Sequence, residues 1–273
     1  MINIKNYNKK YGKKLVAKNI NINVKKGDIV GFIGKNGAGK STTIKALMNI
    51  IFPTSGSLYI DKIDCVEDSK KVKLITSYMP SELQYPSNIK VIDTFKLEAK
   101  LYGKDLNYAL DLAKFLELDL YKKVEELSLG NKKKVGIINC LIRTPKVIIL
   151  DEPTSGLDPV MKDKFFNLLL KEKEKGTTIF LSSHNLIEIE RYCDNVFIIK
   201  DGMILKDFNL NQIKGDLKYN IKYVDDKEKV VEYLFNGNIN EVIKELSNMN
   251  IVDVEIRKQT IEEIFQQYYM EEK

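Results

Sequence analysis

The chain has 273 residues, of which 44% are hydrophobic, a composition that supports one large domain with or without a small appendage and argues against disorder. Lys and Arg number 44 against 38 Asp and Glu, and the resulting net charge of +6 is by itself only a weak argument for nucleic-acid binding. The three cysteines lie far apart without a Cys-x-x-Cys pair, which argues against a disulfide framework or zinc site and fits a reducing, cytoplasmic setting.

Membrane insertion has no support in the hydropathy pattern. The sequence has no run of about 18 or more apolar residues. Its first residues, "MINIKNYNKKYGKK", lack the continuous apolar stretch of a signal peptide. We therefore expect a soluble chain, in which any membrane-spanning part of the function resides in another polypeptide.

The strand-like segments are of two kinds. Apolar and polar residues alternate through "INIKNY" and "NININ", with Ile20, Ile22 and Val24 on one side, which predicts half-buried antiparallel strands. Three later runs are almost continuously aliphatic or β-branched, as in parallel strands covered on both faces: "IVGFI" (29–33), "VIIL" (147–150) and "TIFLS" (178–182). Since helix-like segments separate these three runs, we expect an α/β core.

A glycine-rich loop joins the first of these runs to a helix. Residues 34–41 fit G-x-x-x-x-G-K-[ST], the phosphate-binding loop, and the motif lies between strand and helix as it must. Backbone N–H groups and the helix N-terminus would hold phosphate oxygens, Lys40 would reach the β- and γ-phosphates, and Ser41 would bind Mg²⁺. The alternative is a glycine turn without a ligand, which this context disfavours. The predicted nucleotide-binding residues are Gly34, Asn36, Gly37, Ala38, Gly39, Lys40, Ser41 and Thr42.

The middle of the chain has helical character. Residues 82–143 show helix-like spacing rich in Leu, Lys and Glu and predict a helical subdomain inserted into the core. Within it, "NKKKVG" (131–136) is interpreted as the solvated start of a helix rather than as a substrate contact.

Two adjacent carboxylates end the second aliphatic run, in "VIILDEP" (147–153). Ligands of open α/β sheets bind at the carboxyl ends of strands, and neighbouring strand residues point in different directions. We therefore assign Asp151 to Mg²⁺ and Glu152 to polarising the water that attacks the γ-phosphate. The alternative, a simple helix cap, is less favoured because a phosphate loop lies upstream.

The character changes again after a hairpin predicted to turn at Asp201 and Gly202. Residues 206–273 predict strands at "YNIKYV" and "IVDVEI", a helix at "NEVIKELSN", and a last helix opened by a capping box of Thr260 and Glu263. In that last helix Phe265, Tyr268 and Tyr269 recur at helical spacing, which favours packing or dimerisation over cofactor binding.

One further stretch, "LSLGN" (127–131), resembles the LSGGQ signature of the ATP-binding-cassette (ABC) family. It keeps Leu127, Ser128 and Gly130 and differs at Leu129 and Asn131. The resemblance implies that Ser128 and Gly130 complete a nucleotide site held by a second copy of the chain.

The resemblance extends in order over most of the first 205 residues. Tyr11 stands where the family places an aromatic residue against adenine, and "SGLD" (155–158) resembles its D-loop, which implies an interface position for Asp158. His184, the only histidine, stands where the family's histidine contacts the γ-phosphate. A lone histidine is more often structural, but the matching position favours the functional role.

One position departs from the family pattern. The family usually has a glutamine after the strand that enters the helical subdomain. In this sequence the corresponding position holds Ser81, with Glu82 next to it and Gln84 three residues later. Which of these three takes over its role stays open.

The resemblance implies an α/β fold with a RecA-like P-loop core of mostly parallel strands, an N-terminal antiparallel β subdomain and an inserted helical subdomain (about 82–143). The ATPase domain would span 1–205 and a small α+β accessory domain 206–273. The implied cofactors are ATP and Mg²⁺.

The implied function is ATP binding and hydrolysis for a membrane transporter, with an exporter favoured. Two copies, or this chain and a homologous ATPase subunit, would pair head to tail on a separately encoded transmembrane permease. The chain would then lie at the cytoplasmic face of the membrane, and no nucleic-acid partner is expected.

Two other functions are less favoured by the sequence. An ABC ATPase acting on a ribosome or a nucleic-acid complex usually has two cassettes or a long inserted coiled coil, and neither occurs in the sequence. An unrelated P-loop kinase or GTPase would not require "LSLGN", "SGLD" and His184 in this order, and the sequence has no guanine-reading N-K-x-D stretch.

Overall fold

The computed structural model describes residues 1–215, 218–260 and 262–265. It divides into two compact units, Met1–Asp207 and Phe208–Lys273. Each is described by itself.

The first unit begins with an antiparallel sheet of four strands in the order β2-β1-β4-β5. These strands are β1 (Ile2–Tyr11), β2 (Lys14–Val24), β4 (Ser55–Ile60) and β5 (Ile63–Asp64). Ile20, Ile22 and Val24 of β2 are all buried, as the alternation of the sequence predicts.

The central sheet of this unit has six strands in the order β10-β9-β3-β8-β7-β6. They are β3 (Ile29–Ile33), β6 (Thr76–Met79), β7 (Val147–Asp151), β8 (Thr178–Ser183), β9 (Asn195–Lys200) and β10 (Met203–Asn209). The pairs β3–β8, β3–β9, β7–β8 and β6–β7 are parallel. Every residue of β3, β7 and β8 is buried, because helices cover both faces of the sheet. Parallel pairing brings the carboxyl ends of these strands to one edge.

A two-residue turn joins β9 to β10 at the predicted place. Asp201 and Gly202 both have positive φ, 49° and 83°. That combination is typical of the tight hairpin turn expected from the sequence.

The helices that follow the central strands carry the loops of interest. They are α1 (Lys40–Leu47), α2 (Ser69–Ile75), α6 (Pro159–Glu174) and α7 (Leu186–Tyr192). Ile44 and Leu47 of α1 are fully buried and anchor that helix in the core.

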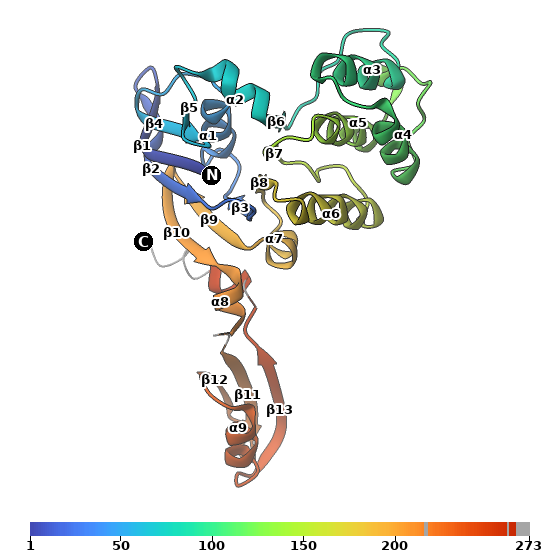
Figure 1. The fold of residues 1–273 in the computed structure, drawn as a ribbon. Coiled ribbons are helices and arrows are strands. Elements are labelled where there is room, and N and C mark those ends of the chain that lie inside the picture. Colours follow the sequence, from blue (N-terminus) through green and yellow to red (C-terminus); the bar gives the residue numbers. More distant parts are fainter. Residues whose placement is uncertain (216–217, 261, 266–273) are drawn as a thin grey trace. The chain divides into compact units, whose positions relative to one another are not determined.

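A group of helices is inserted between β6 and β7 and lies apart from the antiparallel sheet (Figure 1). It comprises α3 (Val91–Tyr102), α4 (Leu106–Phe115), the short 3-10 helix η1 (Val124–Glu126) and α5 (Leu129–Ile142).

The interpretation of "NKKKVG" as a solvated helix start is wrong. Lys133 is fully buried and Lys134 is 8% exposed. Lys133 is buried because it lies on the side of α5 that also carries Ile137 and Leu141, both of which are buried.

The second unit contains a three-stranded antiparallel sheet in the order β12-β11-β13 with a helix against it. Its elements are α8 (Leu210–Gly215), β11 (Tyr219–Asp225), β12 (Val230–Phe235), α9 (Ile239–Leu246) and β13 (Ile251–Lys258). Ile221 of the sheet packs with Val242 and Leu246 of α9 in its small core.

The predicted capping box near the end of the chain is confirmed. The Thr260 N–H donates to Glu263 Oε2 at 2.9 Å, and the Glu263 N–H donates to Thr260 Oγ1 at 3.2 Å. Phe265 is buried, with its ring centroid 5.4 Å from that of Phe208. The predictions for Tyr268 and Tyr269 fall outside the described residues.

Two general features complete the description. Cys65, Cys140 and Cys193 are free thiols, and all three are buried. In the part of the chain that the structure describes, no helix is both long enough and apolar enough to span a bilayer.

Candidate functional site

The glycine-rich loop connects the end of β3 to the start of α1. Gly39 precedes α1 with φ of 110°, a left-handed conformation that disfavours any residue with a side chain. At Gly34 a β-carbon would lie 2.4 Å from the Ile199 carbonyl oxygen, so the chain passes too close for anything but glycine. Asn36 and Gly37 are exposed, whereas Ala38 is buried and Ser41 and Thr42 are half-buried. The free N–H groups of the first turn of α1 therefore adjoin an exposed loop, as in an anion site.

The side chain of Lys40 lies back over this loop. Its ammonium donates to the carbonyl oxygens of Gly34 at 2.6 Å and Lys35 at 3.3 Å. It also lies 3.4 Å from Glu152 Oε1, and the lysine is 6% exposed. The Lys40 ammonium thus contacts both the loop and the carboxylate that follows β7.

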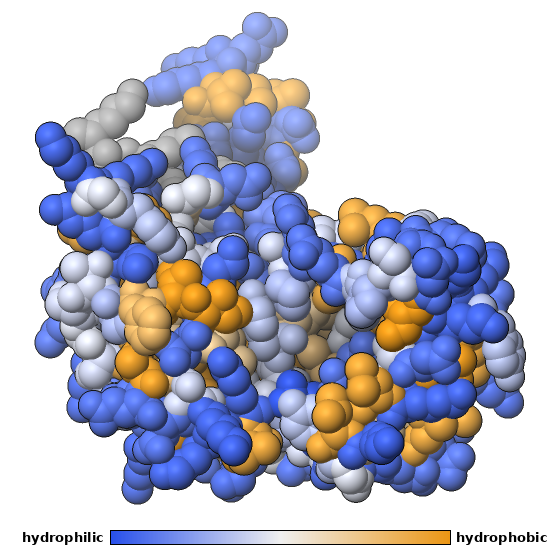
Figure 2. Space-filling view, turned by 90° about the horizontal axis from the view of Figure 1, so that it is seen from above, coloured by the Kyte–Doolittle hydropathy of each residue, from blue (hydrophilic) through white to orange (hydrophobic). Residues whose placement is uncertain are grey.

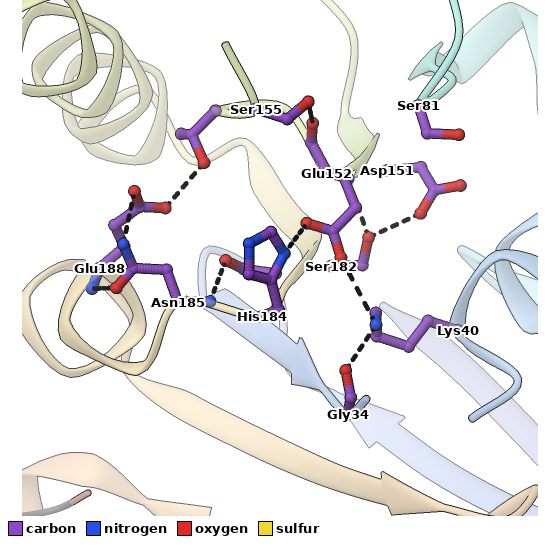
Figure 3. Close-up of polar contacts among 12 residues, drawn as sticks. Gly34, Lys40, Ser81, Asp151, Glu152, Ser155, Ser182, His184, Asn185 and Glu188 are labelled. Atoms are coloured by element: carbon purple, nitrogen blue, oxygen red, sulfur yellow. Dashed lines mark hydrogen bonds and ion pairs between the residues drawn. The ribbon is translucent and has the colours of Figure 1, made fainter. Parts of the chain in front are cut away.

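The two carboxylates that end β7 take different partners. Ser182 of β8 donates from its hydroxyl to Asp151 Oδ1 at 2.7 Å and accepts from the Glu152 N–H at 2.9 Å. Figure 3 shows the Glu152 carboxylate between Lys40 and His184, whereas Asp151 is held by Ser182. Glu152 has φ of 49°, which turns the chain sharply at the strand end and separates the two carboxylates.

A magnesium ion fits the residues near Asp151. Asp151 is fully buried, and its Oδ2 has no hydrogen-bond partner among the described residues. Ser41 contributes a hydroxyl in the first turn of α1. The described residues form no cluster of three or more His, Cys, Asp or Glu side chains suited to a metal. A single carboxylate with a hydroxyl is what a nucleotide-borne Mg²⁺ requires, since phosphates and waters supply its other ligands.

The two carboxylate oxygens of Glu152 differ in their contacts. Oε2 is 2.8 Å from His184 Nδ1, whereas the buried Oε1 accepts no hydrogen bond from the described residues and lies 3.4 Å from Lys40 Nζ. The His184 side chain is 66% exposed. The imidazole therefore reaches the carboxylate from the open side of the site.

A second polar cluster joins the chain after His184 to the turn after Glu152. Asn185 caps α7, accepting from the N–H groups of Ile187 and Glu188, and its amide donates to Glu188 Oε1 at 3.1 Å. The other Glu188 oxygen accepts from Thr154 Oγ1 at 2.8 Å, which links α7 to the turn after Glu152 (Figure 3). Glu188 was not predicted from the sequence, although its spacing from Asn185 is that of a capping box.

A buried lysine lies behind Glu152. Lys133 Nζ donates to the carbonyl oxygen of Ser81 at 2.7 Å and to that of Glu152 at 3.0 Å. Burial lowers the pKa of Lys133, while the charges of Asp151 and Glu152 oppose that shift. Of the three candidates for the missing glutamine, Ser81 makes this contact, whereas Glu82 and Gln84 are exposed.

The remaining predicted residues lie elsewhere on the first unit. Ser128 caps α5, its hydroxyl accepting from the Asn131 N–H at 3.4 Å, and Asp158 caps α6, accepting from the Met161 N–H at 3.0 Å. Between the described residues, no hydrogen bond or ion pair joins Ser128, Gly130 or Asp158 to the loop 34–42. Within one chain these residues are therefore separate from the Lys40 site.

The turns that contain Ser128 and Asp158 touch one another. A β-carbon on Gly130 would lie 2.7 Å from the Gly156 carbonyl oxygen, and one on Gly156 would lie 2.9 Å from Leu129 Cδ2. Tyr11 is in a third place, at the end of β1, 48% exposed and with Lys9 Nζ 4.8 Å from its ring centre. An exposed ring at a strand end is available for stacking.

Comparison with known proteins gives consistent results. A family model described as "ABC transporter" matches residues 17–155. The bacitracin transport ATP-binding protein BcrA of Bacillus licheniformis is 36% identical over 82% of this chain and 74% of its own length. An uncharacterised ABC transporter ATP-binding protein, MJ1023 of Methanocaldococcus jannaschii, is 33% identical over 97% of both chains.

A solved structure agrees with these relatives. The dimeric, post-hydrolysis structure of the ATP-binding cassette MJ0796 bound to ADP and Pi has a TM-score of 0.70 at 26% identity. The match covers 77% of this chain and 99% of that one. The predicted fold class is therefore confirmed by sheet topology and structural likeness together.

Proposed function

Because the chain belongs to the ABC transporter family and is its ATP-binding ATPase subunit, we propose that two copies work as a head-to-tail pair that drives a separately encoded exporter permease. The observation that carries this proposal is the meeting of Lys40, Glu152 and His184 at the carboxyl end of the central sheet. ATP with Mg²⁺ is the cofactor pair of the family.

The roles of the residues follow from their contacts. Lys40 and the N–H groups at the start of α1 bind the β- and γ-phosphates, and for that Lys40 exchanges the Gly34 and Lys35 carbonyls for phosphate oxygens. Ser41 and Asp151 Oδ2, which has no hydrogen-bond partner among the described residues, would hold Mg²⁺, and the ion would neutralise phosphate charge.

Glu152 orients and polarises the attacking water through Oε1, which lies beside Lys40 and accepts no hydrogen bond from the described residues. His184 fixes the Glu152 carboxylate through Oε2, and its exposed ring would contact the γ-phosphate through its other nitrogen. Tyr11 stacks on the adenine.

Pairing of two copies is supported by the position of the "LSLGN" turn. Ser128 and Gly130 lie at the N-terminus of α5, which is an anion-binding position, yet between the described residues no hydrogen bond or ion pair joins them to the nucleotide loop of their own chain. We propose that they, with Asp158, complete the site of the partner copy.

Docking to a permease is supported by exposed apolar residues. Leu74 of α2 and Leu97 and Leu101 of α3 are 64%, 52% and 67% exposed. Both helices lie at the top of Figure 1, and Figure 2, seen from above, shows separate apolar areas on that face. We propose that this face meets the permease and places the chain at the cytoplasmic surface of the membrane. Co-purification of the two proteins from a detergent extract is the measurement.

The exporter assignment takes its support from BcrA, whose name states bacitracin transport. No feature of the described residues favours a ribosome or nucleic-acid partner over a permease.

The test of ATP hydrolysis uses two variants. Glu152→Gln is expected to bind MgATP and to lose turnover by at least about 100-fold, since a general base is removed, so that it accumulates as an ATP-loaded dimer by light scattering. Lys40→Ala is expected to show no MgATP binding by calorimetry. Glu174→Gln and Lys45→Ala change exposed residues of α6 and α1 and serve as controls. Wild-type turnover in Glu152→Gln, or wild-type affinity in Lys40→Ala, would contradict the proposed roles.

A further inference from the structure

Lys133 connects three segments that are distant in sequence. It belongs to α5, and its ammonium donates to Ser81 after β6 and to Glu152 after β7. The side chain is fully buried. Both acceptors are backbone carbonyls, so their positions do not depend on the side chains of Ser81 and Glu152.

A buried ammonium binds these two carbonyl groups at a cost in desolvation free energy. Burial of a lysine carries a desolvation penalty, and Lys133 has no ion pair among the described residues to offset it. Asp151 and Glu152 are near enough for their charges to favour the cation.

The Glu152 peptide is held from three directions. Its N–H donates to Ser182 Oγ, and its carbonyl accepts from Ser155 Oγ at 3.0 Å as well as from Lys133. The residue has a left-handed backbone conformation that non-glycine residues seldom adopt, so it depends on such contacts. Lys133 supplies the only one of these three that comes from the inserted helices.

The loop that contains Ser81 is attached to α5 at a second point. A β-carbon on Gly136 would lie 2.8 Å from Leu83 Cδ1, which means that Leu83 packs directly on the helix backbone. Lys133 and Gly136 are three residues apart and therefore lie on one face of α5. The loop thus moves with α5 if α5 moves.

From these contacts we infer that Lys133 is a positioning residue for hydrolysis, which ties the Ser81 loop and the Glu152 peptide to α5 so that displacement of α5 displaces the Glu152 carboxylate. This inference rests on the proposed role of Glu152. It also gives the Ser81 position, which lacks the usual glutamine side chain, a route to the site through its backbone.

The experiment compares Lys133→Met with Lys133→Gln in the full chain. Methionine keeps the volume and removes the donors, whereas glutamine keeps N–H donors without a charge. Lys133→Met is expected to lower kcat by about 10- to 100-fold, as for a misplaced catalytic group, with KM for MgATP unchanged. Lys133→Gln is expected to recover most of that loss. Lys134→Met, a buried lysine of the same helix for which the described residues provide no hydrogen bond or ion pair, is expected to keep wild-type kcat.

Thermal unfolding separates positioning from packing. Under the proposal the kcat of Lys133→Met falls while its melting temperature stays close to that of Lys133→Gln. Wild-type kcat in Lys133→Met, or equal losses of kcat and melting temperature in both variants, would overturn the inference. If Lys133→Met does not fold, Lys133→Ala replaces it: recovery of kcat by propylamine but not by propanol supports the inference, and no recovery overturns it.

Failure of the proposed function and failure of the Lys133 role give different experimental results. If the wild-type chain does not hydrolyse ATP, or if Glu152→Gln turns over normally, the proposed function is lost. If both behave as expected and Lys133→Met equals wild type, only the role of Lys133 is lost.

Discussion

Glu152 is the residue on which most of the site converges. Its carboxylate has a cation on one side, an imidazole on the other and one oxygen without a hydrogen bond. An arrangement that fixes one oxygen and leaves the second without a hydrogen bond, beside the Lys40 ammonium, suits a group that must aim at a water molecule.

His184 provides the test of this arrangement at the residue scale. His184→Ala removes the partner of Glu152 Oε2, so we expect kcat for ATP to fall by about 100-fold, because the general base loses the contact that orients it. MgATP affinity should change far less, because Lys40 and the loop remain. Steady-state ATPase assays and calorimetry measure the two effects. Unchanged kcat would assign His184 to structure. Glu174→Gln, an exposed residue of α6, again serves as the control.

Much of this cluster was accessible from the sequence, because motifs mark it. Lys40, Glu152 and His184 follow central strands and Asp151 ends one, and the strand-end rule places such residues along one edge. Ser182 and Lys133 were missed. Ser182 gave no signal beyond its strand, whereas Lys133 could have been found from its place on the apolar face of α5. The functional roles of all these residues stay predictions.

At the scale of elements, the buried strands were the most predictable. β3 has the predicted bounds, and β7 and β8 each extend one residue further. Continuous aliphatic runs leave little choice of structure when both faces are covered. The strand β12 was not predicted because its apolar residues occur on both faces: Val230 and Leu234 are exposed, whereas Tyr233 and Phe235 pack toward the core.

The capping box at Thr260 gives a pH-dependent prediction for one helix start. A hydrogen bond from Arg257, together with the Thr260 N–H, holds the pKa of Glu263 below its usual range. Folding therefore favours the ionised carboxylate, and its stabilising contribution is present above the unfolded pKa of about 4.3 and is lost as the pH falls through the folded pKa.

Glu263→Gln isolates this charge, because glutamine preserves the capping box. We expect weaker protection of the Thr260 and Glu263 amides against hydrogen exchange in the variant at pH 6, and a difference that diminishes as the pH falls through the folded pKa of Glu263. Glu255→Gln, whose carboxylate lies 3.8 Å from Arg257 Nε, is the control. A difference that persists at low pH would exclude the ion pair as its cause.

At the scale of the whole molecule, the question is whether one copy holds a complete site. Ser128 and Asp158 cap helices whose starts touch through Gly130 and Gly156. Since these turns pack directly, they present themselves to a partner together rather than one by one.

Mixing two inactive variants tests the shared site. A pair of Ser128→Arg and Glu152→Gln chains contains one site with both defects and one with neither. An equimolar mixture should therefore recover up to about a quarter of wild-type ATPase, because half of the pairs are mixed and each has one intact site. Activity equal to the sum of the separate variants would contradict sharing. Ser128→Ala, which loses the same helix cap without added bulk, controls for the stability of α5.

The hydroxyl of Ser182 also has a consequence for the choice of ion. By donating to Oδ1, it leaves Oδ2 as the Asp151 oxygen without a hydrogen bond among the described residues, which favours a contact to an ion through that one oxygen. Magnesium binds one or two carboxylate oxygens and keeps waters or phosphates for the rest of its octahedral shell, whereas calcium takes six to eight oxygens. A hydroxyl on the neighbouring strand thus orients the Asp151 carboxylate in a way that suits the smaller cation.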